Sequence, residues 1–164
     1  MNIMIVGASM GLGRALMDGL AQDGNTLYGV ARRTPAPSAS PLSPDPGINQ
    51  HWISADLSQP EAASQLAAAC PESLDVLIYN LGIWEDTAFS EDYDFLSQND
   101  QAIRRLVDVN LTGALLAIRH LLPHLLRSKQ PRLILTGSTS GLRQSGRPEV
   151  AFGATKFALN GLAD

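Results

Sequence analysis

Several residue types are scarce in this 164-residue sequence, and each scarcity excludes a class of protein. The single cysteine, Cys70, cannot build an internal disulfide framework and suits a reducing compartment. No run approaches the ~20 apolar residues that span a bilayer, and the chain enters an apolar segment without a basic leader. The net charge of −4 provides no basic surface for nucleic acid or an anionic membrane. We therefore expect a cytoplasmic protein that binds neither.

Metal ligands at a convincing spacing are also lacking. His120 and His124 are four residues apart on a predicted helix, a spacing that can bind zinc. No Glu follows His120, Pro123 intervenes and a third ligand is not apparent, so we interpret the pair as a polar stripe and predict no metal site. The composition, 45% hydrophobic and 17% charged, is typical of one globular domain over residues 1–164.

The first distinctive pattern is a glycine turn near the start of the chain. Gly7, Gly11 and Gly13 follow the apolar run 3–6, and an amphipathic segment begins at once. A strand, a glycine turn and a helix in this order present helix N-terminal N–H groups to a pyrophosphate. The spacing G-x-x-x-G-x-G also fits a tight turn that binds no ligand. Only further motifs in the sequence can distinguish a nucleotide-binding turn from such a turn.

Apolar runs alternate with amphipathic segments along the remaining sequence. This alternation predicts an α/β fold, a Rossmann-type, doubly wound parallel sheet in a three-layer α/β/α arrangement. Strands are expected at 3–6, 26–31, 51–54, 75–79 and 132–136, and helices at 12–20, 59–70, 92–129 and from 148 onward. Pro123 should bend or divide the third helix. Five prolines within 34–50 predict a surface loop there instead of a crossover helix.

Two arginines bear on the choice of cofactor. Arg32 and Arg33 follow the second predicted strand, at the place where a dinucleotide fold meets the adenosine ribose. An acidic residue at this place selects NAD(H). Here Ala31 is not acidic, and Arg32 provides a cation that can bind a 2′-phosphate. NADP(H) is therefore preferred over NAD(H), although a solvated basic pair would look the same.

Motifs spread over the whole chain resemble the short-chain dehydrogenase/reductase family. VGASMGLG at residues 6–13 is similar to the family's T-G-x-x-x-G-x-G, and YNLG at 79–82 is similar to N-N-A-G with two departures. The resemblance implies cofactor contacts from Gly7, Ser9, Met10, Gly11, Leu12, Gly13, Arg32, Arg33, Asp56, Leu57, Asn80, Gly82 and Lys156. It also implies that Asn110 is a structural and proton-relay residue and that Ser138 hydrogen-bonds the substrate oxygen.

The family's Y-x-x-x-K motif is altered. It reads here as FGATK, with Phe152 in place of the tyrosine and Lys156 kept. Residues four apart share a helix face, so both side chains should point at one pocket. In the family the lysine lowers the tyrosine pKa and holds the ribose hydroxyls, and the tyrosine then transfers the proton. Phe152 has no proton to transfer.

The resemblance also predicts further strands after the Lys156 helix, which this chain, ending at Asp164, would lack. An open sheet edge would follow, and a second copy of the chain could cover it, so a homo-oligomer is expected.

Two functions stay open. The first is an NADP(H)-dependent oxidoreductase that interconverts a small carbonyl compound and an alcohol, lacking its proton donor. The second is a redox-silent dinucleotide-binding sensor or scaffold.

Three further residues have two interpretations each. Trp84 either lines the substrate pocket or packs against neighbouring residues. Arg143 and Arg147 either favour an acidic substrate or are solvated loop residues.

Overall fold

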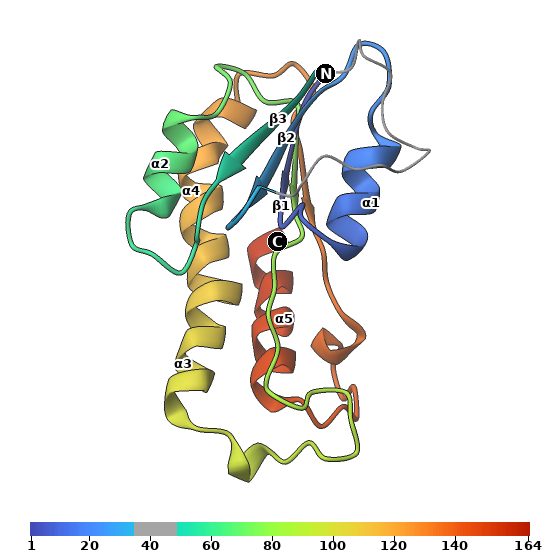
Figure 1. Cartoon of the computed structure of the whole chain (residues 1–164), viewed down its shortest axis with the longest axis vertical. Coiled ribbons are helices and arrows are strands. Elements are labelled where there is room, and N and C mark those ends of the chain that lie inside the picture. The colour runs from blue at the N-terminus through green and yellow to red at the C-terminus, as the bar shows by residue number, and fades with distance from the viewer. Residues whose placement is uncertain (35–48) are drawn as a thin grey trace.

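A five-stranded parallel sheet forms the middle layer of the protein (Figure 1). The computed structural model describes residues 1–34 and 49–164. The strand order is β3-β2-β1-β4-β5, which confirms the predicted doubly wound, Rossmann-type sheet. The strands are β1 (Asn2–Val6), β2 (Thr26–Ala31), β3 (Asn49–Ser54), β4 (Val76–Tyr79) and β5 (Arg132–Leu135).

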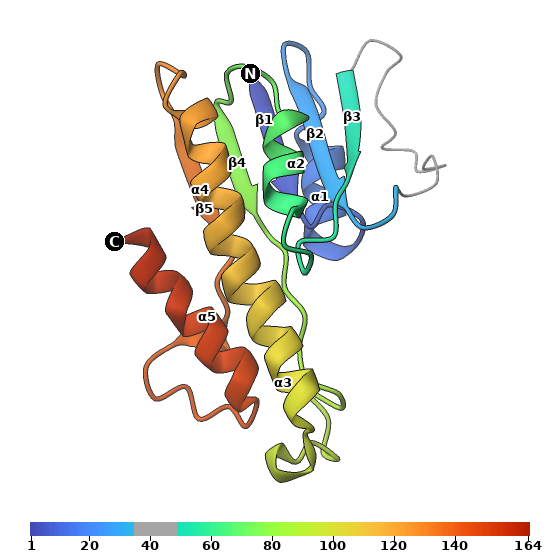
Figure 2. The same cartoon turned by 90° about the vertical axis from the view of Figure 1, so that its left-hand side faces the viewer.

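Helices cover both faces of the sheet, as Figure 2 shows from the side. They are α1 (Gly11–Gly19), α2 (Ala62–Ala68), α3 (Asp100–Val107), α4 (Gly113–Leu125) and α5 (Val150–Ala163). The alternation of side chains along β1 divides the core in two. Met4 and Val6 join the cluster that packs under α2, α4 and α5, whereas Ile3 and Ile5 join the cluster under α1.

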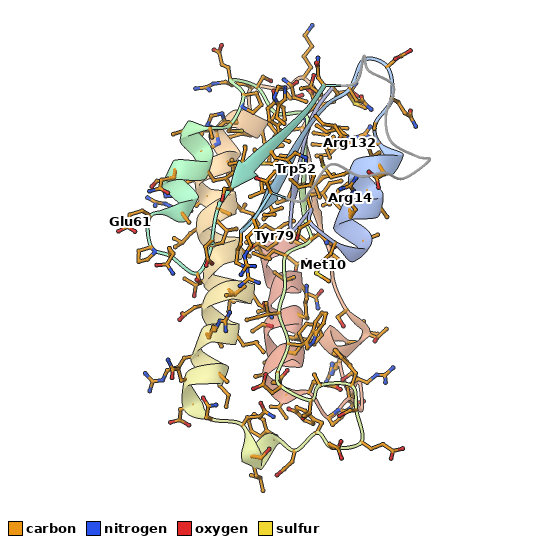
Figure 3. The ribbon with its side chains drawn as sticks, viewed as in Figure 1. Met10, Arg14, Trp52, Glu61, Tyr79 and Arg132 are labelled. Carbon is orange, nitrogen blue, oxygen red and sulfur yellow. The ribbon has the colours of Figure 1, made fainter. Side chains whose placement is uncertain are left out.

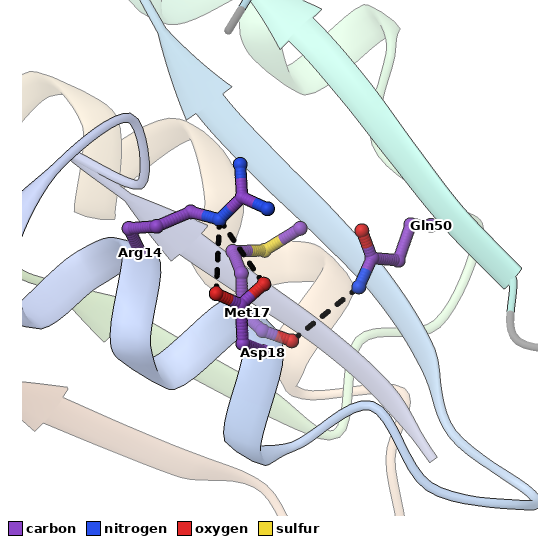
Figure 4. A network of polar contacts seen from close by, with 4 residues as sticks. All are labelled: Arg14, Met17, Asp18 and Gln50. Atoms are coloured by element: carbon purple, nitrogen blue, oxygen red, sulfur yellow. Dashed lines mark hydrogen bonds and ion pairs between the residues drawn. The ribbon is translucent and has the colours of Figure 1, made fainter. Parts of the chain in front are cut away.

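Helix α1 is fixed to the sheet by one buried side chain and by polar contacts around it (Figure 4). Met17 is fully buried against the strands. Its carbonyl oxygen accepts a hydrogen bond of 3.5 Å from Gln50 Nε2 of β3. Arg14 Nε donates to both carboxylate oxygens of Asp18, at 3.0 and 3.1 Å. Met17 and Gln50 thus hold α1 against the sheet, whereas the Arg14–Asp18 ion pair lies within the helix.

Helices α3 and α4 form one continuous helical segment, interrupted by a π-turn at Asp108–Thr112. The 26-residue segment Asp100–Leu125 contains an 18-residue window with a mean hydropathy of 1.2, so by length and composition alone the segment could cross a membrane. Its apolar face instead packs in the core, where Ala117 and Leu121 are fully buried. Pro123 lies in the last turn of α4, and the helix ends soon after, at Leu125.

Two predicted boundaries are wrong. The helix expected over 92–129 begins only at Asp100, because the side chain of Asn99 caps it by accepting from the Ala102 N–H at 2.8 Å. Residues 92–99 instead contain a short 3₁₀ helix, η1 (Phe95–Ser97). The loop expected over 34–50 falls largely outside the described residues, but Asn49 and Gln50 already belong to β3.

A buried hydroxyl generates a stability prediction. Tyr79, the last residue of β4, is 1% exposed, and its hydroxyl has no hydrogen-bond partner among the described residues. Burial raises the pKa of this hydroxyl. Tyr79→Phe should stabilise the fold by about 1–2 kcal/mol, because an unpaired buried hydroxyl costs about that much. Urea unfolding measures the change.

Tyr28→Phe serves as the matched control. Tyr28 is only partly buried and its ring stacks on His51, so removal of its hydroxyl should change stability by less than ~0.5 kcal/mol. A destabilised Tyr79→Phe protein would show that this hydroxyl has a partner, such as a buried water.

Candidate active site

A cavity of about 580 Å³ lies at the carboxyl ends of the strands. Parallel strands of a doubly wound sheet bring their carboxyl ends to the same edge, where ligands bind. In Figure 3, Met10 and Tyr79 lie toward this edge, and Arg132, the first residue of β5, lies at the opposite one. The loops that follow all five strands contribute to the lining, and α3, the π-turn and α5 supply the rest.

The glycine turn lets α1 approach the end of β1 closely. Gly7 has φ +85°, and a Cβ atom there would lie 2.8 Å from the Leu81 backbone nitrogen. A Cβ atom on Gly13 would lie 2.0 Å from the Gly7 carbonyl oxygen. Neither position can carry a side chain without movement of the backbone. The turn is therefore built for close packing of backbone segments around the cavity.

The N-terminus of α1 offers unpaired donors to the cavity. Its N-cap residue, Met10, makes no side-chain capping bond, and the first turn contains no acid. The first N–H groups of a helix have no partner within it, and the helix dipole favours an anion beside them. Ser9, Met10, Gly11 and Leu12 all line the cavity and are exposed. This arrangement fits a phosphate group.

Cations surround Asp56 at the outer end of the cavity. The Asp56 carboxylate accepts from the Ser58 hydroxyl at 2.7 Å and from the Ser58 N–H at 3.1 Å. The hydrogen bond from the hydroxyl is the main reason that the pKa of Asp56 is lowered, and the charges of Arg32 and Arg105 add to it. Arg32 and Leu57 line the cavity, whereas Arg33 is exposed and does not.

Arg105 is a cavity residue that the sequence analysis missed. It lies on α3 four residues before Val109, and both side chains line the cavity. Because residues four apart share a helix face, this spacing was the available signal.

Ser138, Phe152 and Lys156 line the opposite end of the cavity, together with Asn80 and Gly82. Lys156 Nζ donates to the Thr136 carbonyl oxygen at 2.9 Å and lies 5.8 Å from the centre of the Phe152 ring. Burial lowers the pKa of Lys156. The structure thus brings together the candidate substrate-binding serine, the altered tyrosine position and the conserved-motif lysine.

Asn110 lies in the π-turn behind this wall and is 2% exposed. Its Oδ1 accepts from the Ile83 N–H at 2.7 Å, and its Nδ2 donates to the Ile83 carbonyl oxygen at 2.7 Å. A third bond, of 3.1 Å, runs from Nδ2 to Thr155 Oγ1 of α5. Asn110 therefore ties the segment after β4 to α5. π-Turns of this kind are frequent at functional sites.

The remaining candidates have different surroundings. Trp84 lines the cavity and also packs on other rings, so both interpretations of it apply. Arg143 and Arg147 are exposed and are absent from the cavity lining. His124 Nδ1 lies 2.8 Å from the Pro71 carbonyl oxygen, in a contact that joins α4 to the loop before β4.

Comparisons with known proteins agree with this geometry. The sequence model of the family described as short chain dehydrogenase matches residues 1–164. An NADPH-dependent pterin aldehyde reductase from Arabidopsis thaliana is 31% identical over an alignment of 173 residues that covers 99% of this chain and 66% of that protein. The Pseudomonas aeruginosa RhlG/NADP active-site complex superposes with a TM-score of 0.82 at 30% identity, covering 98% of this chain and 63% of that one.

A second solved structure, a short chain dehydrogenase from Shigella flexneri complexed with NADP, has a TM-score of 0.82 and 28% identity, with 98% of this chain and 68% of that one covered. The chain spans about half to two thirds of the length of the curated relatives it matches.

Proposed function

This chain belongs to the short chain dehydrogenase family, and from that premise we propose that it is the cofactor-binding and catalytic part of an NADP(H)-dependent oxidoreductase acting on a small carbonyl or alcohol substrate. The observation that carries the proposal is that Ser138 and Lys156 line the cavity that begins at the glycine turn, while Asn110 behind them bonds Ile83 and Thr155. Each of these residues comes from a different part of the sequence.

The residues present fit a dinucleotide phosphate. Free N–H groups of α1 face one part of the cavity, and the turn has no side chain that would block a close approach. Arg32 would hold a 2′-phosphate, with Arg105 near it, and Asp56 with Leu57 would flank the adenine. Lys156 and Asn80 would hold the nicotinamide half. The named relative that uses NADPH and the two NADP complexes support this choice.

When bound, NADP(H) supplies or accepts the hydride. The Ser138 side chain acts on the substrate oxygen: its Oγ accepts from the Ser140 N–H at 3.1 Å, so its own proton remains available to donate. The Lys156 ammonium, which lines the same cavity, would stabilise the negative charge that develops on this oxygen. Asn110 keeps the backbone of Ile83 and helix α5 in fixed relative positions.

Phe152 supports the second candidate function, a redox-silent binding protein. A phenyl ring can neither donate nor accept the proton that accompanies hydride transfer. Such a protein would still bind the cofactor, because the glycine turn, Arg32 and Lys156 do not depend on the missing hydroxyl. The two functions differ in chemistry but share one binding site.

The proposed cofactor choice predicts a measurable preference. NADPH should bind at least ~10-fold more tightly than NADH, because a charge-assisted hydrogen bond to the 2′-phosphate contributes about 1.5–3 kcal/mol. Arg32→Ala should remove most of the difference, as measured by titration calorimetry. Arg104→Ala is the charge-matched control, since Arg104 is exposed and outside the cavity lining. Equal affinities in the unmodified chain would refute the preference.

The chemistry is tested by restoring the hydroxyl. Phe152→Tyr should raise the rate of NADPH-dependent reduction at least ~100-fold for some member of a panel of aldehydes, ketones and quinones, because general acids typically contribute 10²–10⁴-fold. Phe157→Tyr adds the same hydroxyl to an exposed position of α5 and should change nothing. A folded Phe152→Tyr protein that binds NADPH but reduces nothing would favour the redox-silent function.

A third prediction concerns self-association, which we propose as a twofold dimer. In the part of the chain that the structure describes, β5 pairs only with β4, and its side chains Leu133 and Ile134 are 37% and 46% exposed. An open apolar strand edge favours pairing with another copy. Sedimentation at tens of micromolar should show the dimer, and Ile134→Lys should weaken it at least ~10-fold. A stable monomer would count against the assembly.

A further inference from the structure

Three aromatic rings meet at the end of the cavity that Ser138 and Lys156 line, although only 5% of the sequence is aromatic. The ring centres of Trp84 and Phe89 are 5.8 Å apart, those of Trp84 and Phe152 are 6.4 Å apart, and those of Phe89 and Phe152 are 5.7 Å apart. Interplanar angles of 73°, 84° and 88° make every contact edge-to-face. We call these three residues the aromatic wall.

The wall is unusually open for an aromatic cluster. Phe152 is 6% exposed, but Trp84 and Phe89 are 59% and 57% exposed. Trp84 and Phe152 line the cavity. A cluster that served only to pack the core would hide its rings, because burial is the source of the stabilisation. In the aromatic wall, by contrast, much of the apolar surface of Trp84 and Phe89 faces solvent.

Two buried carboxylates hold the wall in place. Glu85 is 4% exposed, and its Oε1 accepts from the N–H groups of Ala151 and Phe152 at 2.8 and 3.0 Å. Glu149 is 3% exposed, and its Oε1 accepts from the Phe89 N–H at 2.9 Å. The segment after β4 and the start of α5 are thus joined in both directions. The second oxygen of each carboxylate has no partner among the described residues.

The backbone of the same segment is strained. Thr87 and Phe89 have φ values of 60° and 66°, in the left-handed region that residues with a Cβ atom rarely adopt. Strained backbone of this kind costs free energy and clusters at ligand-binding positions. Buried charges with unpaired oxygens are also costly. Rings that stay exposed among the described residues bury little apolar surface, so their packing offsets little of the free energy that the strained backbone and the unpaired oxygens cost. A ligand that covers the rings would supply the missing burial.

The charges at this end of the cavity indicate what kind of ligand that is. The lining residues include three cationic side chains, of which Arg32 and Arg105 lie beside Asp56 at the other end. Lys156 is the cation at the wall, and its ammonium is already bonded to Thr136. The arginines that could have bound an acidic substrate, Arg143 and Arg147, do not line the cavity. An uncharged ligand therefore fits better than an acid.

We propose that the aromatic wall selects planar, uncharged aromatic aldehydes and ketones, with Trp84 as the specificity-determining residue and Phe89, which contacts the Trp84 ring from outside the cavity lining, as its positioning residue. The inference rests on the proposed function, since it names the substrate class of the same site. A flat ring packs on the exposed rings, and its carbonyl group shares the cavity with Ser138. The saturated skeleton of the same size is puckered and loses the aromatic contacts.

The test compares 2-naphthaldehyde with decahydro-2-naphthaldehyde in the presence of NADP⁺, which prevents turnover. Affinities are measured by ligand-observed NMR titration of the whole chain, so the readout does not depend on activity. The planar aldehyde should bind at least ~5-fold more tightly than the saturated one, as expected for aromatic contacts beyond simple burial. Trp84→Leu and Phe89→Leu, which keep an apolar side chain, should each reduce this preference at least ~2-fold.

Leu96→Ala is the control on the same segment, because Leu96 is 91% exposed and does not line the cavity. The second tryptophan, Trp52, covers Gly29 in the core beneath α1. In a Trp52→Phe background, quenching of Trp84 emission by the planar aldehyde should locate its binding at the wall. Unchanged emission would overturn the inference.

The two proposals fail in different ways. Equal affinities for the two aldehydes, or no binding of either, would overturn the aromatic selection while NADPH binding and the Phe152→Tyr activity could still stand. If the protein binds 2-naphthaldehyde at Trp84 but has no affinity for NADP(H), the inference about the aromatic wall stands and the proposed function is overturned.

Discussion

The hydrogen bonds of Asn110 are the constraint on which the site depends. One amide side chain satisfies both backbone groups of Ile83 and also bonds Thr155 on α5. Loss of this amide would leave polar groups unpaired in a half-buried place, at about 1–3 kcal/mol each. The segment that carries Trp84 and the helix that carries Lys156 therefore cannot move independently. The part of the cavity lined by Lys156 and the aromatic wall therefore depend on the same junction.

The sheet and most of the cleft could be predicted from the sequence because they follow from local patterns. Buried parallel strands read as short apolar runs, and parallel strands deliver their following loops to one edge. Gly7 was expected at this edge from the order of strand, glycine turn and helix, whereas Asn80 and Ser138 were expected there from the family motifs, and all three line the cavity. The family motifs added Lys156 and Asn110, whose positions on their helices no apolar period would identify.

What escaped prediction depends on contacts between distant residues. Glu85 and Glu149 look like surface acids in the sequence, and only the fold shows them buried against the N–H groups of α5 and Phe89. The same long-range bonds explain why the residues before Asp100 are not helical: Tyr93, for example, donates to Glu85 and accepts from the Val150 N–H. No periodicity within that segment carries this information.

The π-turn at Asp108–Thr112 makes the number of residues between α3 and α4 important for the site. A π-turn holds one residue more than a regular helical turn, so deletion of one residue there would leave a regular α-helix in which α3 and α4 keep nearly the same relative orientation. Arg105 would then stay at the cleft, whereas the turn that carries Val109 and Asn110 would be rebuilt. In an alignment of related sequences, a one-residue gap at this turn would therefore identify a protein in which the contacts of Asn110 with Ile83 and α5 have changed.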